Sequence, residues 1–143
     1  MIKVICGGKP NKDWTLSAIS EYEKRLTKPF NIEWEFYEEE KLAKLLETWP
    51  FTSRDFTILL DERGQLLSSP EFTAKLENCF NSSLNPIIII GGAYGVSVEA
   101  RARASLTLSL SPMVFPHLLA RTILVEQLYR AQEIQKGSKY HHL

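Results

Sequence analysis

The most informative pattern of hydrophobic and polar positions lies between residues 106 and 136. Leucine at positions 106, 108 and 110 alternates with threonine or serine, and this period of two predicts a strand with one buried face. Pro112 and Pro116 follow. Because prolines donate no backbone hydrogen bond and hold φ near one value, we predict a stiff loop here, able to present its backbone groups to a ligand.

From His117 onward, apolar residues recur at intervals of three and four, which predicts a helix with a wide buried stripe. Arg121, Glu126, Gln127 and Arg130 interrupt that stripe. Polar groups on so apolar a helix are costly to bury unless they are paired or used, so they are candidate site residues. Glu126 and Arg130 are four residues apart and could equally pair with each other.

The rest of the chain alternates predicted strands and helices. Two apolar runs without alternation, 56–60 and 87–90, are typical of strands covered on both faces, whereas the acidic alternate positions of 32–36 favour an edge strand. Asp13 and Ser69 are predicted N-caps, and DERG at 61–64 has the composition of an ordinary turn. The remaining predicted elements are a strand at 2–6 and helices at 13–26, 41–47, 69–80 and from Ser97.

This order predicts one α/β domain over residues 1–143, with a mainly parallel sheet and helices on both faces. Ligands of such sheets bind where loops leave the carboxyl ends of the strands. We therefore expect a site formed by the loops near residues 60 and 91 and the loop 110–116. The glycine-rich GGAYG at 91–95 is either a ligand loop or a tight turn. A dinucleotide fingerprint is disfavoured because no carboxylate follows about 20 residues later.

Composition narrows the possible partners. The 143 residues carry no formal net charge, so general attraction to a phosphate backbone should be weak, although the segment from residue 101 onward is basic. No long apolar run predicts a membrane span or signal peptide, which favours a cytoplasmic protein. Cys6 and Cys79 lack metal-ligand spacing and should be reduced and packed. Adjacent His141 and His142, without a third ligand, make a poor metal site.

Three stretches carry a family resemblance: LDERGQLLSS at 60–69, IIIIGGAYG at 87–95 and LSLSPMVFPHLLARTILVEQLYRA at 108–131. The opening CGGKPNKDW, EYEKRL at 21–26 and the closing Tyr140-His141 match as well. The chain resembles the ribosomal RNA large-subunit methyltransferase H family, a minimal member of the SPOUT class. The resemblance implies a C-terminal trefoil knot, S-adenosylmethionine as cofactor, and methylation of ring N3 of a pseudouridine in 23S ribosomal RNA by a homodimer on assembled ribosomes.

The resemblance also implies site residues. It places cofactor contacts on Leu60, on Gly91 and on six consecutive loop residues: Leu110, Ser111, Pro112, Met113, Val114 and Phe115. Family members usually carry threonine where Val114 stands, so only backbone recognition can be expected there. The competing hypothesis is a non-catalytic α/β module that binds a nucleotide or RNA through the same loops.

For catalysis we expect Arg130 to hold the base or a phosphate, His141 to accept a proton and Tyr140 to stack on or hydrogen-bond the nucleotide. His117 should position the cofactor loop. The C-terminal tail is expected to be mobile until a partner orders it, so Tyr140 and His141 of one subunit would complete the pocket around Arg130 and the cofactor of the other.

Overall fold

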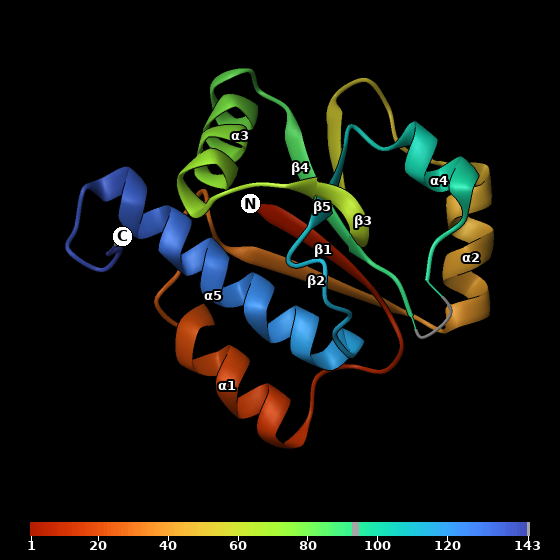
Figure 1. Cartoon of the computed structure of the whole chain (residues 1–143), viewed down its shortest axis with the longest axis horizontal. Coiled ribbons are helices and arrows are strands. Elements are labelled where there is room, and N and C mark those ends of the chain that lie inside the picture. Colours follow the sequence, from red (N-terminus) through yellow and green to blue (C-terminus); the bar gives the residue numbers. More distant parts are fainter. Residues whose placement is uncertain (93–94, 143) are drawn as a thin grey trace.

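The computed structural model describes residues 1–92 and 95–142 as one α/β unit (Figure 1). The strands are β1 (Ile2–Gly7), β2 (Ile32–Tyr37), β3 (Asp55–Leu66), β4 (Asn85–Ile90) and β5 (Leu106–Ser109). The helices are α1 (Asp13–Glu23), α2 (Glu39–Thr48), α3 (Ser69–Asn81), α4 (Val98–Arg103) and α5 (His117–Lys136). The predicted strict alternation of strands and helices is confirmed.

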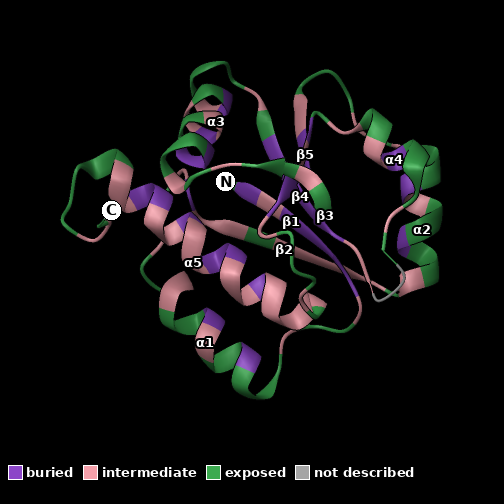
Figure 2. Cartoon of the chain, viewed as in Figure 1, coloured by how far each residue is buried: buried purple, intermediate pink, exposed green. Residues whose placement is uncertain are grey.

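The five strands form a parallel sheet in the order β2-β1-β4-β3-β5. Its central strands are buried on both faces, as their unbroken apolar sequences predicted (Figure 2). Residues of α3 and α5 pack with one face of the sheet in one hydrophobic cluster, and α1 lies along α5. Leu42 and Leu46 of α2 and Ala100 of α4 pack with the opposite face. The predicted edge position of β2 is confirmed, and β5 forms the other edge.

Two features of β3 and β5 correct the sequence prediction. Residues 61–64 are part of β3 rather than an ordinary turn. Leu60 and Gln65 both pair with Leu108 of β5, so the four intervening residues bulge out of the ladder. Gly64 makes this excursion possible, because a Cβ atom there would lie only 2.5 Å from the Thr107 carbonyl oxygen. The strand β5 ends at Ser109, before Leu110.

The N-termini of the helices show why the N-cap residue is hard to predict where two polar residues are adjacent. The N-cap of α3 is Ser68 rather than Ser69: its hydroxyl accepts from the Glu71 amide, and the Glu71 carboxylate accepts from the Ser68 amide in a capping box. Asp13 is not the N-cap of α1, since Lys12 takes that position and Asp13 has a φ of 55°. Ser97 caps α4 as predicted, accepting from the Ala100 amide.

Arg121 is the most unusual core residue, because its side chain is fully buried without a carboxylate partner among the described residues. Its guanidinium donates to the Gly7 carbonyl at 2.9 Å, the Lys9 carbonyl at 2.8 Å and the Asn11 side-chain oxygen at 3.1 Å. These bonds tie the first turns of α5 to the loop between β1 and α1. Arg121, predicted as a candidate site residue, therefore has a structural role in the core and cannot contact a ligand at the surface.

Both cysteines are free and buried, as predicted. Burial raises the pKa of the Cys6 thiol to about 12, although the neighbouring Arg121 opposes this shift. Cys6 is therefore a protonated, packed side chain at neutral pH. Among the described residues, no helix is long and apolar enough to span a membrane.

Replacing Arg121 with methionine should lower the free energy of unfolding by about 3 kcal/mol, because buried carbonyl acceptors lose their donor. Urea denaturation of Arg121→Met would measure this loss. Arg54, exposed just before β3, provides the control, and Arg54→Met should change stability by less than about 0.5 kcal/mol. Equal stabilities for the two variants would show that the buried hydrogen bonds contribute nothing net.

Candidate cofactor and catalytic site

A cavity of about 750 Å³ opens at the ends of β4 and β5, beside residues 60–63 of β3. This is the carboxyl edge of the sheet, where the alternating fold predicted a ligand site. Six of the eight residues predicted to contact a cofactor line it together: Leu60, Gly91, Leu110, Met113, Val114 and Phe115. The predicted positioning residue His117 also lines it. Three loops distant in sequence thus meet at one cavity.

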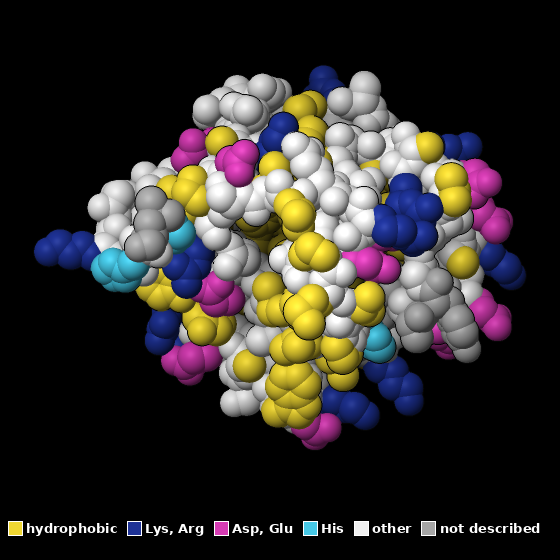
Figure 3. All heavy atoms as spheres, viewed as in Figure 1, with side chains coloured by type: hydrophobic (Ala, Val, Ile, Leu, Met, Phe, Trp, Pro, Cys, Tyr) yellow, Lys and Arg dark blue, Asp and Glu magenta, His cyan; other side chains and the backbone are white. Residues whose placement is uncertain are grey.

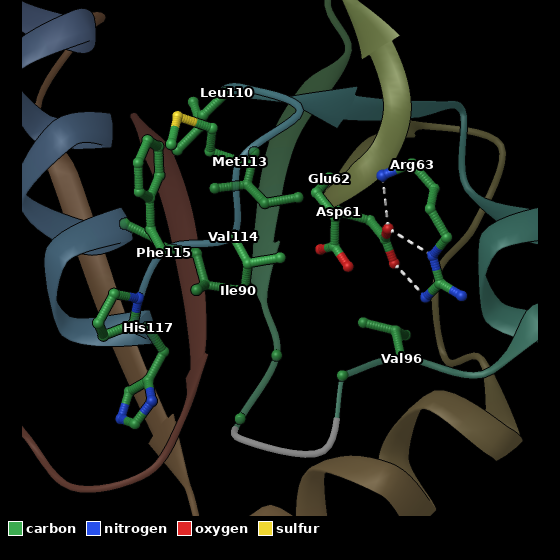
Figure 4. A pocket seen from close by; sticks show the side chains of 16 residues that line it. Asp61, Glu62, Arg63, Ile90, Val96, Leu110, Met113, Val114, Phe115 and His117 are labelled. Carbon is green, nitrogen blue, oxygen red and sulfur yellow. Dashed lines mark hydrogen bonds and ion pairs between the residues drawn. The ribbon is translucent and has the colours of Figure 1, made fainter.

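The loop after β5 forms the apolar wall of this cavity (Figure 4). Met113 and Val114 are 73% and 74% exposed. Ser111 and Pro112 are not among the lining residues, and Ser111 instead shapes the loop: its hydroxyl accepts from the Met113 amide at 3.0 Å, and its carbonyl accepts from the Ser109 hydroxyl at 2.8 Å. Local hydrogen bonds therefore hold the wall in place before any ligand arrives.

The opposite wall comes from the glycine-rich segment and the excursion of β3. Gly95 has a φ of 74°, as the tight-turn interpretation of GGAYG required, whereas Ala93 and Tyr94 lie outside the described residues. A Cβ atom at Gly91 would lie 3.1 Å from a Val96 methyl group. Space beside Gly91 is therefore limited by a side chain that itself lines the cavity.

Asp61, Glu62 and Arg63 are cavity residues that the sequence interpretation missed. Asp61 has a side chain only 3% exposed, and it accepts from Arg63 Nε and Nη2, both at 2.9 Å. The hydrogen bond from Arg63 is the main reason why the pKa of Asp61 is lowered. Arg101 of α4 lies 3.6 Å from the same carboxylate. The only available signal was a charged DERG segment at the carboxyl end of an apolar strand.

The other predicted catalytic residues form a separate cluster at the far end of α5. Glu126 accepts from Arg130 Nε at 3.0 Å and Nη2 at 2.7 Å, so the pairing suggested by their spacing is confirmed. The Tyr140 hydroxyl donates to the same carboxylate oxygen at 2.9 Å. His117 and Arg130 are about 20 Å apart along the helix at 1.5 Å per residue. One chain therefore keeps the cavity and this cluster apart.

The C-terminal residues fold back onto their own helix, which corrects the expectation of a free tail. The Tyr140 ring packs on Tyr129, with ring centroids 4.7 Å apart, and lies 4.8 Å from the Arg130 guanidinium. His141 Nδ1 lies 3.1 Å from Arg130 Nη1. Tyr140 and His141 thus contact Arg130 of the same chain, rather than leaving it to a partner's tail.

These contacts limit which groups can act as a base. Arginine has only donors, so His141 Nδ1 accepts the hydrogen bond and the ring hydrogen lies on Nε2. Nε2 is buried and has no hydrogen-bond partner within the described part of the chain. Burial, together with the hydrogen bond to Glu126, raises the pKa of Tyr140 to about 12. Tyr140 is therefore a donor at neutral pH.

The fold and site define the class as an α/β protein with a preformed ligand cavity at the carboxyl edge of a parallel sheet. The sequence profile of one family, described as predicted SPOUT methyltransferase, matches residues 1–141. The chain belongs to this SPOUT methyltransferase family.

Relatives named ribosomal RNA large subunit methyltransferase H match almost end to end. The protein of Oleidesulfovibrio alaskensis is 36% identical, with 99% of this chain and 98% of the relative covered. For Geotalea daltonii the identity is 38%, with 99% of each chain covered, and for a Synechococcus strain it is 39%, with 97% and 94% covered. The family resemblance found in the sequence motifs is therefore confirmed.

A solved structure supports the fold independently. The probable methylase family protein of Haemophilus influenzae superposes with a TM-score of 0.58, covering 99% of this chain and 70% of that chain. Since its sequence is only 12% identical, this similarity bears on the fold alone.

Replacing Glu126 with glutamine should lower the pKa of Tyr140 below about 12, because the phenolate would no longer face a carboxylate. The pKa should stay above its usual value of 10.0, since burial is the larger cause of the shift. NMR titration of the ring carbon bonded to the hydroxyl, with Tyr140→Phe to assign the signal, would measure both values. A Tyr140 pKa near 10 in the unsubstituted protein would contradict the described cluster.

Proposed function

We propose that this protein is an S-adenosylmethionine-dependent methyltransferase that modifies ring N3 of a pseudouridine in 23S ribosomal RNA. The observation that carries the proposal is the convergence of Leu60, Gly91 and four residues of the loop 110–115 on one cavity, in a chain that belongs to the SPOUT methyltransferase family. The named relatives, similar over nearly their full length, support ribosomal RNA as the substrate.

The cavity has the chemistry that the cofactor requires. Leu110, Met113, Val114 and Phe115 offer apolar surface for an adenine ring, and the loop is held by its own hydrogen bonds, which lowers the entropic cost of binding. Backbone groups of this loop can recognise the adenine edge, so valine at position 114 is tolerated. Bound S-adenosylmethionine supplies the electrophilic methyl group.

The exposed Glu62 carboxylate also suits this ligand. Glu62 lines the cavity, and its side chain points toward the apolar wall (Figure 4). S-adenosylmethionine carries a sulfonium and an ammonium group, and its net charge at neutral pH is positive. A carboxylate inside the cavity therefore stabilises the cofactor.

The substrate must lose its N3 proton before or during attack on the methyl group. Arg130 is suited to stabilise the anionic base, because its guanidinium is held by Glu126 and remains charged. Tyr140 contributes a ring for stacking and a hydroxyl donor. His141 accepts a proton at Nδ1 only after it separates from Arg130, so its role requires a rearrangement of the described contacts.

We propose that the protein acts as a homodimer with sites shared between subunits. Arg130, which Tyr140 and His141 contact, is about 20 Å from His117 along α5. We therefore infer that this cluster reaches a cofactor cavity most directly in a second copy. In Figure 3 hydrophobic side chains gather in a band down the middle of the face that bears the cavity loop. Such an apolar surface favours association.

Two further aspects follow from the family resemblance and the charge. We propose that the C-terminal part of the chain is threaded as a trefoil knot; the close packing of Gly64 on the Thr107 backbone is compatible with such threading. We also propose that the protein acts in the cytoplasm on assembled ribosomes. A small domain with no net charge makes few phosphate contacts, so shape and a second subunit must supply affinity.

S-adenosylmethionine at about 100 times its dissociation constant should stabilise the protein by about 2.7 kcal/mol in a thermal shift measurement. Gly91→Leu should abolish this shift, because its side chain must displace Val96 at the cavity wall. Gly91→Ala is the matched control: its Cβ needs only a small movement of Val96, so binding should persist. Stabilisation by flavin mononucleotide but not by S-adenosylmethionine would favour the non-catalytic binding module.

The shared site can be tested by complementation. Gly91→Leu removes the cofactor, and truncation after Lys139 removes Tyr140 and His141, so each homodimer should be inactive. A mixed dimer keeps one complete site if the cofactor cavity and the C-terminal residues of each site come from different subunits. Mixing the variants should therefore restore methyl transfer to ribosomes. If subunit exchange is verified by mass spectrometry and no activity returns, each tail acts within its own chain.

A further inference from the structure

The four-residue excursion of β3 places a pair of charged side chains at the rim of the cofactor cavity. Leu60 and Gln65 pair with the same residue of β5, so residues 61–64 are pushed out of the sheet. Bulges of this kind re-aim side chains and often adjoin active sites. Here the excursion turns Asp61 inward, where it is buried, and leaves the side chain of Arg63 58% exposed.

Asp61 holds Arg63 in one orientation. It accepts from the Arg63 backbone amide at 2.8 Å as well as from Nε and Nη2. Arg101 contributes a second cation to the same carboxylate from α4 and also donates to the Val96 carbonyl at 3.0 Å. The buried carboxylate is thereby fixed from two elements, and it fixes the Arg63 guanidinium in turn.

The orientation leaves one edge of Arg63 available. An arginine has five N–H donors, and Asp61 takes two of them, one on Nε and one on Nη2. The Nη1 hydrogens and the second Nη2 hydrogen, which form the other edge, have no hydrogen-bond partner among residues 1–92 and 95–142. That edge is the fork that binds phosphate oxygens in a bidentate manner.

The other candidate cations near the cavity are already engaged in hydrogen bonds or ion pairs within the protein. Arg121 is buried against carbonyl groups, and the Arg101 side chain is only 20% exposed beside Asp61. Arg63 is therefore the lining arginine with its charge directed toward solvent. In Figure 4 it lies on the side of Asp61 away from the apolar wall, whereas Glu62 points toward that wall.

We propose that Arg63, held in place by Asp61, binds a backbone phosphate of the RNA strand that carries the target nucleotide. Asp61 is a positioning residue in this arrangement, and Arg63 makes the contact. The inference rests on the proposed function, because it takes RNA as the substrate. It adds a substrate contact next to the cofactor, on the subunit that supplies the cavity.

The charge layout favours a phosphate over the carboxylate of the cofactor as the partner of Arg63. Glu62 makes the side of the cavity that faces the apolar wall negative, which suits a cationic cofactor and repels a carboxylate. The free edge of Arg63 lies toward solvent on the other side of Asp61. A polyanion that approaches from outside meets this cation first, and its phosphate oxygens match the guanidinium fork.

The test measures binding of the whole protein to purified bacterial 70S ribosomes over a range of salt concentrations. Arg63→Gln should weaken binding and reduce the slope of log affinity against log salt by about one, as expected for one lost phosphate contact. Arg54→Gln removes the same charge from an exposed position just before β3, away from the cavity, and should leave the slope unchanged. Equal slopes for both variants and the parent would overturn the proposal.

The Asp61→Asn variant distinguishes positioning of Arg63 from general electrostatic attraction, because the two predict opposite changes in affinity for ribosomes. It raises the net charge by one, so general attraction alone predicts tighter binding to ribosomes, whereas loss of the Arg63 orientation predicts weaker binding. Tighter binding by Asp61→Asn, with S-adenosylmethionine affinity retained as evidence of an intact fold, would overturn the positioning role. Arg63→Gln, at an exposed position, tests the contact even if Asp61→Asn does not fold.

Cofactor affinity and turnover separate this proposal from the proposed function. If Arg63→Gln weakens S-adenosylmethionine binding but not the salt slope, Arg63 contacts the cofactor and the RNA contact is wrong. If the parent protein transfers methyl groups and Arg63→Gln has the same salt slope as Arg54→Gln, the proposed function is supported and the proposed phosphate contact is wrong. If the parent neither binds the cofactor nor methylates ribosomes, yet Arg63→Gln reduces the salt slope, the proposed function is wrong. The phosphate contact is then supported, in a protein that binds RNA without modifying it.

Discussion

The arrangement of the site depends on the buried Arg121 guanidinium. A cation in a protein interior loses its hydration, and this cost must be offset by good hydrogen bonds. Arg121 obtains them from carbonyl groups at the end of β1 and in the loop that follows. Because these acceptors are fixed by the sheet, they fix the first turns of α5. His117 and the loop 110–116 are thereby held opposite residues 60–63 of β3 and the end of β4, and the cavity lies between them.

The second constraint is the close approach of two backbones at Gly64. The strand β3 must leave its ladder after Leu60 and rejoin it at Gln65 while passing the Thr107 carbonyl. Only a residue without a Cβ fits that passage. The excursion in turn lets one carboxylate be buried among arginines at the cavity. A packing requirement of the sheet thus becomes an electrostatic property of the site, with Asp61 ionised and inaccessible and Arg63 charged and exposed.

The sequence predicted most of the fold because its periodicities are local. The apolar runs at 56–60 and 87–90 directly predict strands that are buried on both faces. A parallel sheet then brings the loops that follow its strands to one edge. The missed features depend on distant partners. DERG resembles a turn until its register with Leu108 is known. The burial of Arg121 requires acceptors more than 100 residues earlier in the chain. At the start of α3 two adjacent serines have the same capping chemistry, so composition could not choose between them.

The two ends of α5 explain why so small a domain would work in pairs. The first turn of the helix borders the cofactor cavity, and Glu126 and Arg130, which the C-terminal residues contact, lie in its middle and second half. A helix is stiff, so these groups cannot close the distance within one chain by a local movement. Glu126 and Tyr140 also hold Arg130 in an arrangement that is complete before any substrate arrives. In the proposed homodimer a second subunit would bring a preorganised group to the cavity at low entropic cost. On this view the homodimer supplies what larger enzymes obtain from added domains, and Arg63 would mark the subunit that holds the methyl donor.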